Sequence, residues 1–156
     1  MLFRSIVEAL WLLVRAVAFA SINPSNYSRV AALRVFGARI GPCVVVKPGV
    51  KVKFPWRLEV GEHSWIGEDA WIDNLAEVTI GAHSCISQGA YLCTGNHDWK
   101  SETFDLVVAP IRIGREAWVA AKVIVGPGVV IGDRAVVTLG TIVRKEIGRA
   151  SCRERV

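Results

Sequence analysis

The segment LCTGNHDWKS, residues 92–101, carries His97, one of only three histidines in the chain. An imidazole has a reference pKa of about 6.5, so near neutral pH it can take a proton from a hydroxyl group or bind a metal ion. The sequence on both sides is a regular succession of valine, isoleucine and glycine. Packing of such a scaffold does not require a histidine, and local hydrogen bonding in a loop is the alternative to a chemical role.

The other two histidines, His63 and His83, are twenty residues apart. If the scaffold repeats with that spacing, their side chains occupy equivalent positions and stack at an outer corner. A stacked pair can indicate a metal site, but no third histidine lies in the same register. We therefore interpret both as surface histidines and expect no bound metal.

Aliphatic residues recur at every sixth position along most of the chain, from Ile40 to Val143. Small or β-branched residues stand four positions after most of them, and glycine often follows directly. This pattern is the hexapeptide repeat of a parallel β-helix, in which three short faces form one triangular coil around an aliphatic core. We attribute the glycines to backbone angles that other residues resist.

The phase of the repeat shifts by two residues at the end of each early coil. Coil starts therefore fall at Ile40, Val60, Ile80, Ile113 and Ile131. The sequence predicts an all-β solenoid of about five coils over residues 38–145. Each strand is expected to lie roughly 4.8 Å from the equivalent strand of the next coil.

One interruption breaks the repeat. Nineteen positions separate Leu92 from Ile111 where six would continue it, so thirteen extra residues leave the third coil as a loop. Binding and catalytic residues concentrate on loops that a rigid scaffold positions. His97 lies in this loop, which closes at Ala109-Pro110.

The first 37 residues lack the repeat and are predicted to form two helices. In MLFRSIVEALWLLVRAVAFA, the charged residues Arg4, Glu8 and Arg15 fall near one side of a helix and leave a wide apolar face. The segment is too short and too charged to be a membrane span of about 20 apolar residues. The apolar face is expected to pack on the domain or on a neighbouring subunit, and contact with the inner face of the cytoplasmic membrane is the alternative. The second helix is predicted over residues 25–37.

The composition of the 156-residue chain, 21% charged and 52% hydrophobic, is typical of a globular domain. The net charge of +5 includes no dense block of lysine and arginine, so we expect no nucleic acid partner. The four cysteines form no CxxC pair and are interpreted as reduced thiols of a cytoplasmic protein.

Two segments, CTGNHDW and PIRIGREAWVAAKVIVGPGVVIGDRAVV, resemble the galactoside, maltose and xenobiotic O-acetyltransferase group. The similarity is strongest to the acetyltransferases of colanic-acid and related exopolysaccharide pathways, and it covers roughly residues 30–145. The resemblance implies a left-handed β-helix that forms a homotrimer. It also implies transfer of an acetyl group from acetyl-CoA to a sugar hydroxyl in surface polysaccharide biosynthesis.

In this family the histidine of the extruded loop is the general base, and it corresponds to His97. The chemistry fits, because a sugar hydroxyl is a poor nucleophile until its proton is removed, and imidazole suits that task at neutral pH. A covalent acetyl intermediate on the nearby Cys93 is the alternative route.

The family binds acetyl-CoA in the groove between two adjacent β-helices of the trimer, so that one chain holds half a site. The mostly small or apolar lining suits the pantetheine arm, and an arginine is available for a phosphate. The corresponding positions in this chain are Ser87, Trp118, Ala121, Leu139 and Arg144.

The twenty-residue stacking rule yields further candidates beneath the loop. Glu77 would lie below His97 and could orient its imidazole, and an ion pair between Glu77 and Arg57 is the alternative. Asp73 and Asn74 would lie below the start of the loop, as candidate contacts for the acceptor.

The last eleven residues, EIGRASCRERV, abandon the repeat. They correspond to the in-frame translation of a common sequencing-adapter sequence, whereas the family continues after Lys145 with a proline-containing turn and a segment that caps the last coil. We expect residues 146–156 to be non-native and to carry no function.

Other functions stay open at the level of the sequence. The chain could acetylate a non-sugar small molecule, or it could be a β-helix scaffold without catalytic activity. The γ-class carbonic anhydrases share this fold and hold a metal with three histidines, so metal analysis would separate that alternative, and acetyl-CoA binding would separate the scaffold.

Overall fold

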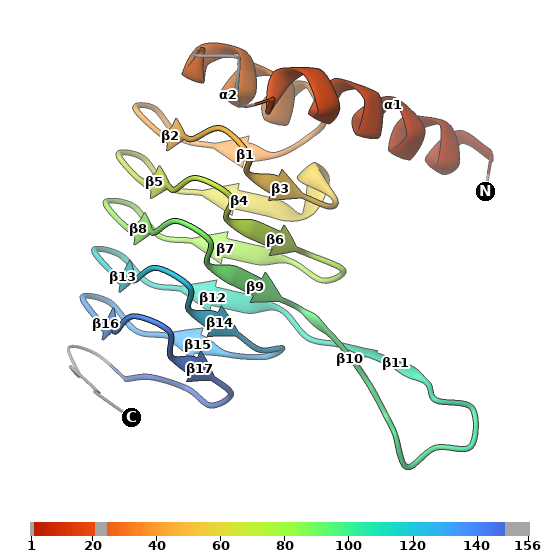
Figure 1. The fold of residues 1–156 in the computed structure, drawn as a ribbon, viewed down its shortest axis with the longest axis vertical. Coiled ribbons are helices and arrows are strands. Elements are labelled where there is room, and N and C mark those ends of the chain that lie inside the picture. The colour runs from red at the N-terminus through yellow and green to blue at the C-terminus, as the bar shows by residue number, and fades with distance from the viewer. Residues whose placement is uncertain (1, 21–24, 149–156) are drawn as a thin grey trace.

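The structure of the protein is a computed structural model that describes residues 2–20 and 25–148, with side chains described from Ile6 onward. Two helices, α1 (Leu2–Ala18) and α2 (Asn26–Val35), precede a solenoid of short parallel strands (Figure 1). The expected all-β solenoid of five coils with helices at its N-terminal end is confirmed. The predicted second helix begins and ends within two residues of the expected bounds.

Each coil contributes one strand to each of three five-stranded sheets, which we call sheets A, B and C. Sheet A contains β1 (Arg39–Ile40), β4 (Leu58–Val60), β7 (Val78–Ile80), β12 (Ile111–Ile113) and β15 (Val130–Ile131). Sheet B contains β2 (Val45–Val46), β5 (Trp65–Ile66), β8 (Cys85–Ile86), β13 (Trp118–Val119) and β16 (Val136–Val137). Sheet C contains β3 (Lys51–Val52), β6 (Trp71–Asp73), β9 (Tyr91–Cys93), β14 (Ile124–Val125) and β17 (Ile142–Val143).

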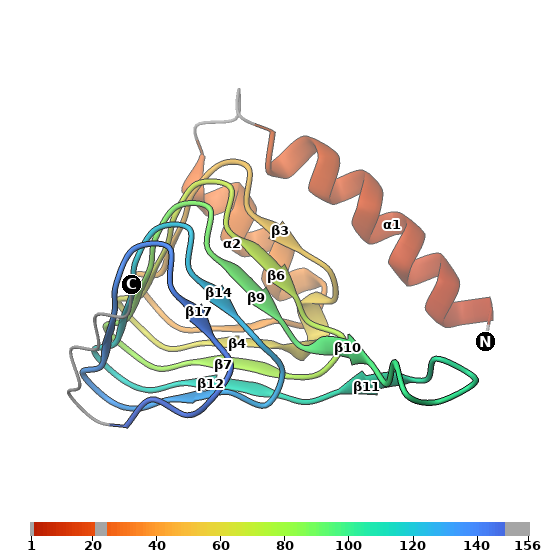
Figure 2. The same cartoon turned by 60° about the horizontal axis from the view of Figure 1, so that its bottom comes forward.

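The coil is left-handed. In Figure 2 the C-terminal coils are nearest the viewer, and the chain runs clockwise through sheets A, B and C as it approaches. Parallel crossovers are almost always right-handed in other folds, so this handedness is a property of the repeat and not of general strand chemistry.

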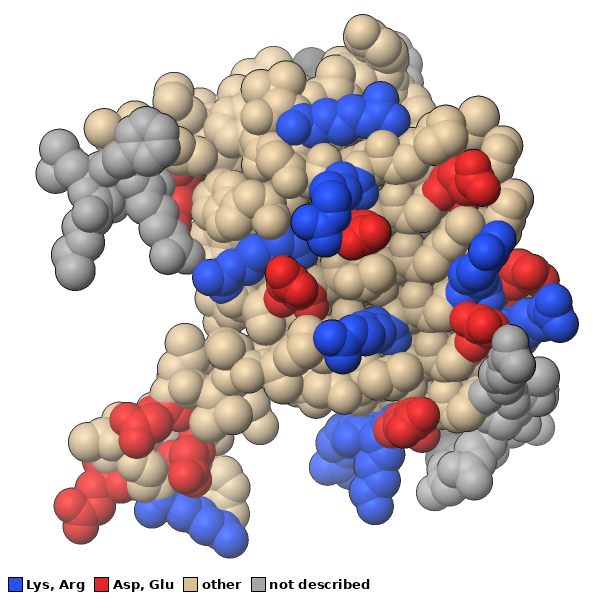
Figure 3. All heavy atoms as spheres, turned by 180° about the vertical axis from the view of Figure 1, so that it is seen from behind, with Lys and Arg blue, Asp and Glu red and all other residues tan. Residues whose placement is uncertain are grey.

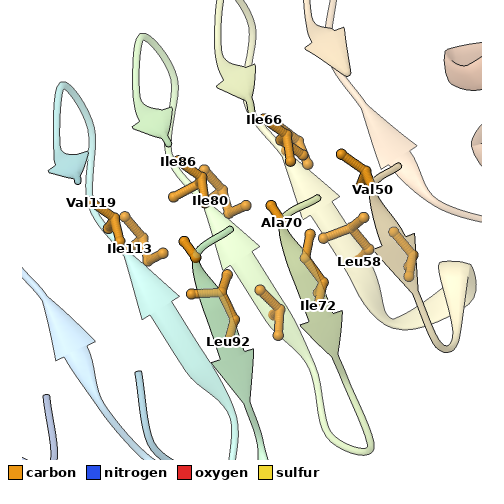
Figure 4. Packing of buried hydrophobic residues seen from close by; sticks show 14 of the residues in the cluster. Val50, Leu58, Ile66, Ala70, Ile72, Ile80, Ile86, Leu92, Ile113 and Val119 are labelled. Atoms are coloured by element: carbon orange, nitrogen blue, oxygen red, sulfur yellow. The ribbon is translucent and has the colours of Figure 1, made fainter. Parts of the chain in front are cut away.

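The core is a set of stacked aliphatic columns, one for each sheet (Figure 4). Ile66 pairs in register with Ile86, and Ile86 pairs with Val119, so one inward side chain lies above the next. All three side chains are fully buried. The twenty-residue register of the early coils is therefore confirmed, and the scaffold is rigid because every coil is packed against its neighbours.

The glycines that follow the aliphatic position have a different cause from the one expected. Gly81 does not adopt a left-handed backbone, but a Cβ there would lie 2.5 Å from the carbonyl carbon of Gly114 in the next coil. A Cβ on Gly41 would lie 2.6 Å from the backbone nitrogen of Glu62. These positions are glycine because adjacent coils approach each other too closely for a side chain.

Left-handed backbone angles occur instead at two corners of each coil. One corner holds His63 and His83, with φ angles of 54° and 58°, and their rings stack with centroids 5.1 Å apart. The predicted stacking of these histidines at an outer corner is confirmed. The other corner is occupied by glycine in some coils, such as Gly89 with φ of 64°.

Side chains of α2 satisfy the open backbone edge of the first coil. The amide of Asn26 donates to the carbonyl of Val44 and accepts from the N–H of Val46, at 3.0 and 2.7 Å. The buried guanidinium of Arg29 donates from Nε to the carbonyl of Val46 at 2.7 Å. An unpaired strand edge would otherwise expose polar backbone groups, so these contacts cap the solenoid at its N-terminal end.

Pairing at the C-terminal end continues beyond β17. Ile147 forms a parallel bridge with Ile131, and its backbone hydrogen bonds reach Val130 and Gly132. The first residues of the expected non-native tail therefore continue the coil as far as the described part of the chain reaches. Residues 149–156 lie outside the described residues, and their non-native origin stays a prediction.

Candidate active site

The extruded segment is a β-hairpin that projects from the corner between sheets C and A (Figures 1 and 2). Strand β10 (Gly95–His97) pairs in antiparallel fashion with β11 (Leu106–Val108), and His97 lies opposite Leu106. Near the tip of the hairpin, side-chain hydrogen bonds from Thr103 and Ser101 hold the pKa of the Asp105 carboxyl below its usual value. The predicted interruption of the third coil is thus confirmed as an ordered arm that carries the histidine away from the solenoid.

Two buried side chains fasten the base of the hairpin. The hydroxyl of Thr94 donates to the carbonyl of Asp73 at 3.0 Å and accepts from the N–H of Ala76 at 2.9 Å. Asn74, directly beneath Thr94 in the stack, donates to the carbonyl of Phe54 at 2.7 Å and accepts from its N–H at 2.9 Å. Because Asn74 is fully buried and its amide binds the backbone, we correct its assignment from acceptor contact to structural clamp.

The imidazole of His97 has a defined orientation and tautomer. Its Nδ1 lies 2.9 Å from the carbonyl oxygen of Phe104. A carbonyl oxygen can only accept a hydrogen bond, so Nδ1 carries the proton in the neutral ring. Nε2 is then the unprotonated nitrogen, which is the form required of a general base.

Phe104 holds this ring in two ways. Its aromatic ring stacks on His97 with centroids 4.4 Å apart and an interplanar angle of 9°. Its backbone adopts φ of 51°, an unusual angle for a bulky residue, where its carbonyl accepts the hydrogen bond from His97. Sequence reasoning assigned Phe104 no role, because neither the stack nor the backbone angle has a signature in the local sequence.

Glu77 is not beneath His97. The chain leaves the coil at Gly95 and returns at Ile111, whose N–H donates to the carbonyl of Glu77 at 3.0 Å. The register that was expected to place Glu77 below His97 therefore ends at the base of the hairpin. Glu59 raises the pKa of Arg39 through a hydrogen bond and through its charge, and the charge of Glu77 raises this pKa to a smaller extent. The group that orients His97 is Phe104.

Asp73 lies at the expected position below Cys93, but its carboxylate is already engaged. Oδ2 accepts a hydrogen bond from the hydroxyl of Tyr91 at 3.1 Å, and Oδ1 lies 3.1 Å from Nζ of Lys53 in an ion pair. Burial, with the neighbouring Cys93 and Asp73, raises the pKa of Tyr91, so its hydroxyl stays a donor. Contact between Asp73 and an acceptor would require these partners to move.

Four of the five positions expected to contact acetyl-CoA gather near the corner between sheets B and C. Trp118 donates from Nε1 to the hydroxyl of Ser87 at 2.9 Å. The carbonyl of Ala121 accepts from the N–H of Gly140 at 3.0 Å, which brings the exposed Leu139 beside it. Arg144 follows β17 and lies at the other end of sheet C, away from these four.

Comparison with known proteins yields clear relatives, although no family model matches the chain. A protein of Escherichia coli named as the colanic acid biosynthesis acetyltransferase WcaF is 47% identical over 139 residues, which cover 88% of this chain and 76% of that protein. The chain belongs to the hexapeptide-repeat acetyltransferase family. The galactoside O-acetyltransferase of Escherichia coli is 28% identical over 133 residues, covering 83% of this chain and 66% of that enzyme.

Solved structures of hexapeptide-repeat acetyltransferases share the fold of this chain. A galactoside acetyltransferase in complex with coenzyme A superposes with a TM-score of 0.85 at 23% identity, over 93% of this chain and 74% of that one. A Vibrio cholerae hexapeptide-repeat acetyltransferase complexed with acetyl coenzyme A gives a TM-score of 0.84 at 22% identity, over 93% and 80%.

A metal site and a cysteine nucleophile are the alternatives to a histidine base in this member of the hexapeptide-repeat acetyltransferases. Within residues 2–20 and 25–148, no group of three or more histidine, cysteine or acidic side chains is placed to hold a metal ion. The thiol of Cys93 donates to the carbonyl of Gly95 at 3.2 Å, a contact at the base of the hairpin.

Proposed function

We propose that this chain is an acetyl-CoA-dependent O-acetyltransferase that acts on a sugar hydroxyl in the biosynthesis of a surface polysaccharide, with His97 as the general base. The observation that carries the proposal is the hydrogen bond from Nδ1 of His97 to the carbonyl of Phe104, which leaves Nε2 unprotonated. The names of the two Escherichia coli relatives support a sugar-containing acceptor.

The reaction needs one base and no covalent intermediate. Nε2 of His97 takes the proton of the acceptor hydroxyl as its oxygen attacks the thioester carbonyl of acetyl-CoA. The carbon–sulfur bond then breaks, the acetyl group stays on the acceptor oxygen, and the imidazolium returns a proton to the leaving thiolate. A backbone N–H would stabilise the oxyanion that forms in between.

We place acetyl-CoA against the corner formed by Ser87, Trp118, Ala121 and Leu139. Arg144 lies away from these four residues and stays an expected contact for a phosphate. This placement goes with a proposed homotrimer, because His97 projects from a different corner of the chain and would meet this surface on a neighbouring subunit. The outer face of sheet B also exposes Trp65 and Trp118, at 41% and 49% of their surface, as expected for a subunit contact.

The proposal is tested by mass spectrometry of a panel of activated sugars and oligosaccharides incubated with acetyl-CoA and the protein. The expected result is a gain of one acetyl group on a sugar acceptor, with release of one equivalent of free thiol. Acetylation confined to non-sugar alcohols would replace the sugar acceptor by a small-molecule one. Absence of acetyl-CoA binding, measured by calorimetry on the folded protein, would favour the non-catalytic scaffold.

Substitution of Phe104 by alanine is expected to lower kcat by about tenfold while KM for acetyl-CoA is unchanged. The substitution removes the ring that stacks on His97 but keeps the carbonyl that accepts the hydrogen bond from Nδ1, so the base is present but less well oriented. Phe104→Tyr keeps the stack and is expected to retain activity. Equal losses of kcat in both variants, measured by steady-state kinetics, would contradict a positioning role for the ring.

A further inference from the structure

Helix α1 lies across the N-terminal end of the solenoid, beside β3 (Figures 1 and 2). Its anchor is Trp11, whose Nε1 donates to the carbonyl of Val52 at 2.9 Å and whose ring packs against Phe19 and Phe36. Among residues 6–18 only Trp11 and Ala18 are buried. The helix is thus held by one narrow side, and most of its circumference faces outward.

The outward side of α1 is apolar. Ile6, Leu10, Leu13 and Val17 are 52%, 51%, 68% and 75% exposed. Their spacing of four, three and four residues places them in one row along the helix. An apolar row of this length on a protein surface indicates a partner. No helix in the described part of the chain is both long and apolar enough to cross a membrane.

Charge along the chain indicates which partner fits. Residues 1–57, a range that includes the helices and the first coil, contain nine lysines and arginines and one acid, Glu8. Residues 58–148 contain seven lysines and arginines and twelve acids. The helix-capped end of the solenoid is therefore positive, and the rest of it is negative.

Basic side chains also lie on the first coil, which α1 covers. Lys51 is exposed on β3, next to the residue that binds Trp11, and its ammonium lies 5.7 Å from the centre of the Trp71 ring. Lys47 directly follows β2, and its ammonium lies 4.9 Å from the centre of the Trp65 ring. Arg15 lies in the last turn of α1, but it follows Trp11 by four residues and therefore shares the helix side that faces the solenoid. Lys53 is exposed as well, and it is paired with Asp73 of the second coil.

The acidic groups of the hairpin point the other way. Asp98, Glu102 and Asp105 are exposed there, and acidic side chains gather on this arm in Figure 3. In Figure 1 the arm extends from the third coil away from α1. On the sheet A face, also seen in Figure 3, basic and acidic side chains alternate, as in the ion pair between Arg39 and Glu59.

We propose that the row Ile6, Leu10, Leu13 and Val17, together with Lys47 and Lys51 of the first coil, docks this end of the protein onto a membrane surface rich in anionic lipids. An apolar helix face with cations beside it lies in the headgroup region, where the apolar side chains are buried and the cations meet lipid phosphates. A second copy is a poorer occupant, because its own helix-capped end carries the same positive charge.

The test is co-sedimentation of the full chain with lipid vesicles. We expect binding to vesicles of phosphatidylcholine with about 30% phosphatidylglycerol, at least tenfold weaker binding to pure phosphatidylcholine, and release by added salt. The double variant Leu13→Gln/Val17→Gln is expected to lose at least tenfold in affinity, and Lys47→Gln/Lys51→Gln about tenfold. All four residues have exposed or half-buried side chains, so the fold is expected to survive.

A matched control is Ile142→Gln, which removes an isoleucine that is 62% exposed at the opposite end of the solenoid. It should bind anionic vesicles like the unchanged chain. Absence of vesicle binding, or equal binding to neutral and anionic vesicles, would overturn the proposal. A change of oligomeric mass in Leu13→Gln/Val17→Gln without any vesicle binding would assign the face to a second copy instead. Vesicle binding requires no acetyl transfer, so this outcome is separate from that of the proposed function.

Discussion

His97→Ala is expected to lower kcat for acetyl transfer by about 10²–10⁴-fold, the range that a positioned general base contributes. The imidazole is on an exposed arm that is fastened by Thr94 and Phe104, so its removal leaves the core untouched. Affinity for acetyl-CoA, measured by calorimetry, should stay within about twofold, because His97 is proposed to act on the acceptor hydroxyl and is not among the expected contacts of acetyl-CoA.

The matched control is His83→Ala, which removes an equally exposed histidine from the same coil. It should retain full activity, because the ring of His83 stacks only on His63 at the far side of the solenoid. Cys93→Ser separates the two routes, since direct transfer predicts an active variant and an acetyl-cysteine intermediate predicts an inactive one. Equal activity of His97→Ala and His83→Ala would remove His97 from the mechanism.

Gly81→Ala is expected to destabilise the fold by about 2 kcal/mol, because the new methyl group would meet the backbone of the next coil. The Cβ would lie 2.5 Å from the carbonyl carbon of Gly114 and 2.6 Å from the nitrogen of Arg115, and neither backbone atom can move alone. For a chain of this size the melting temperature should fall by about 4–8 °C.

Gly126→Ala provides the control at the same repeat position. Its Cβ would meet only the carbonyl oxygen of Val143 at 3.3 Å, in the last coil, where a shift of a few tenths of an ångström relieves the contact. Its free energy of unfolding should change by less than about 1 kcal/mol. Equal melting temperatures for the two variants, measured by calorimetry, would show that coil spacing does not require glycine.

The architecture of this protein could be predicted from the sequence because the pattern of aliphatic residues is periodic. Aliphatic residues at every sixth position can all be buried only if the chain turns through three faces per coil, so the repeat determines the sheets, the register and the number of coils. The same arithmetic located the interruption after Leu92 and the stacked pair His63 and His83. The proposed general base was also named from the sequence, although through resemblance and not through periodicity.

The environment of the site could not be read in this way, because it depends on contacts that no repeat encodes. Glu77 lost its expected place under His97 since the chain leaves the register at the hairpin, and Asn74 proved to be a buried clamp. Phe104 acquired its role from a backbone angle and a ring stack that arise only once β10 and β11 have paired. A repeat specifies what recurs from coil to coil, whereas the tautomer of one imidazole is set by a hydrogen bond that occurs once.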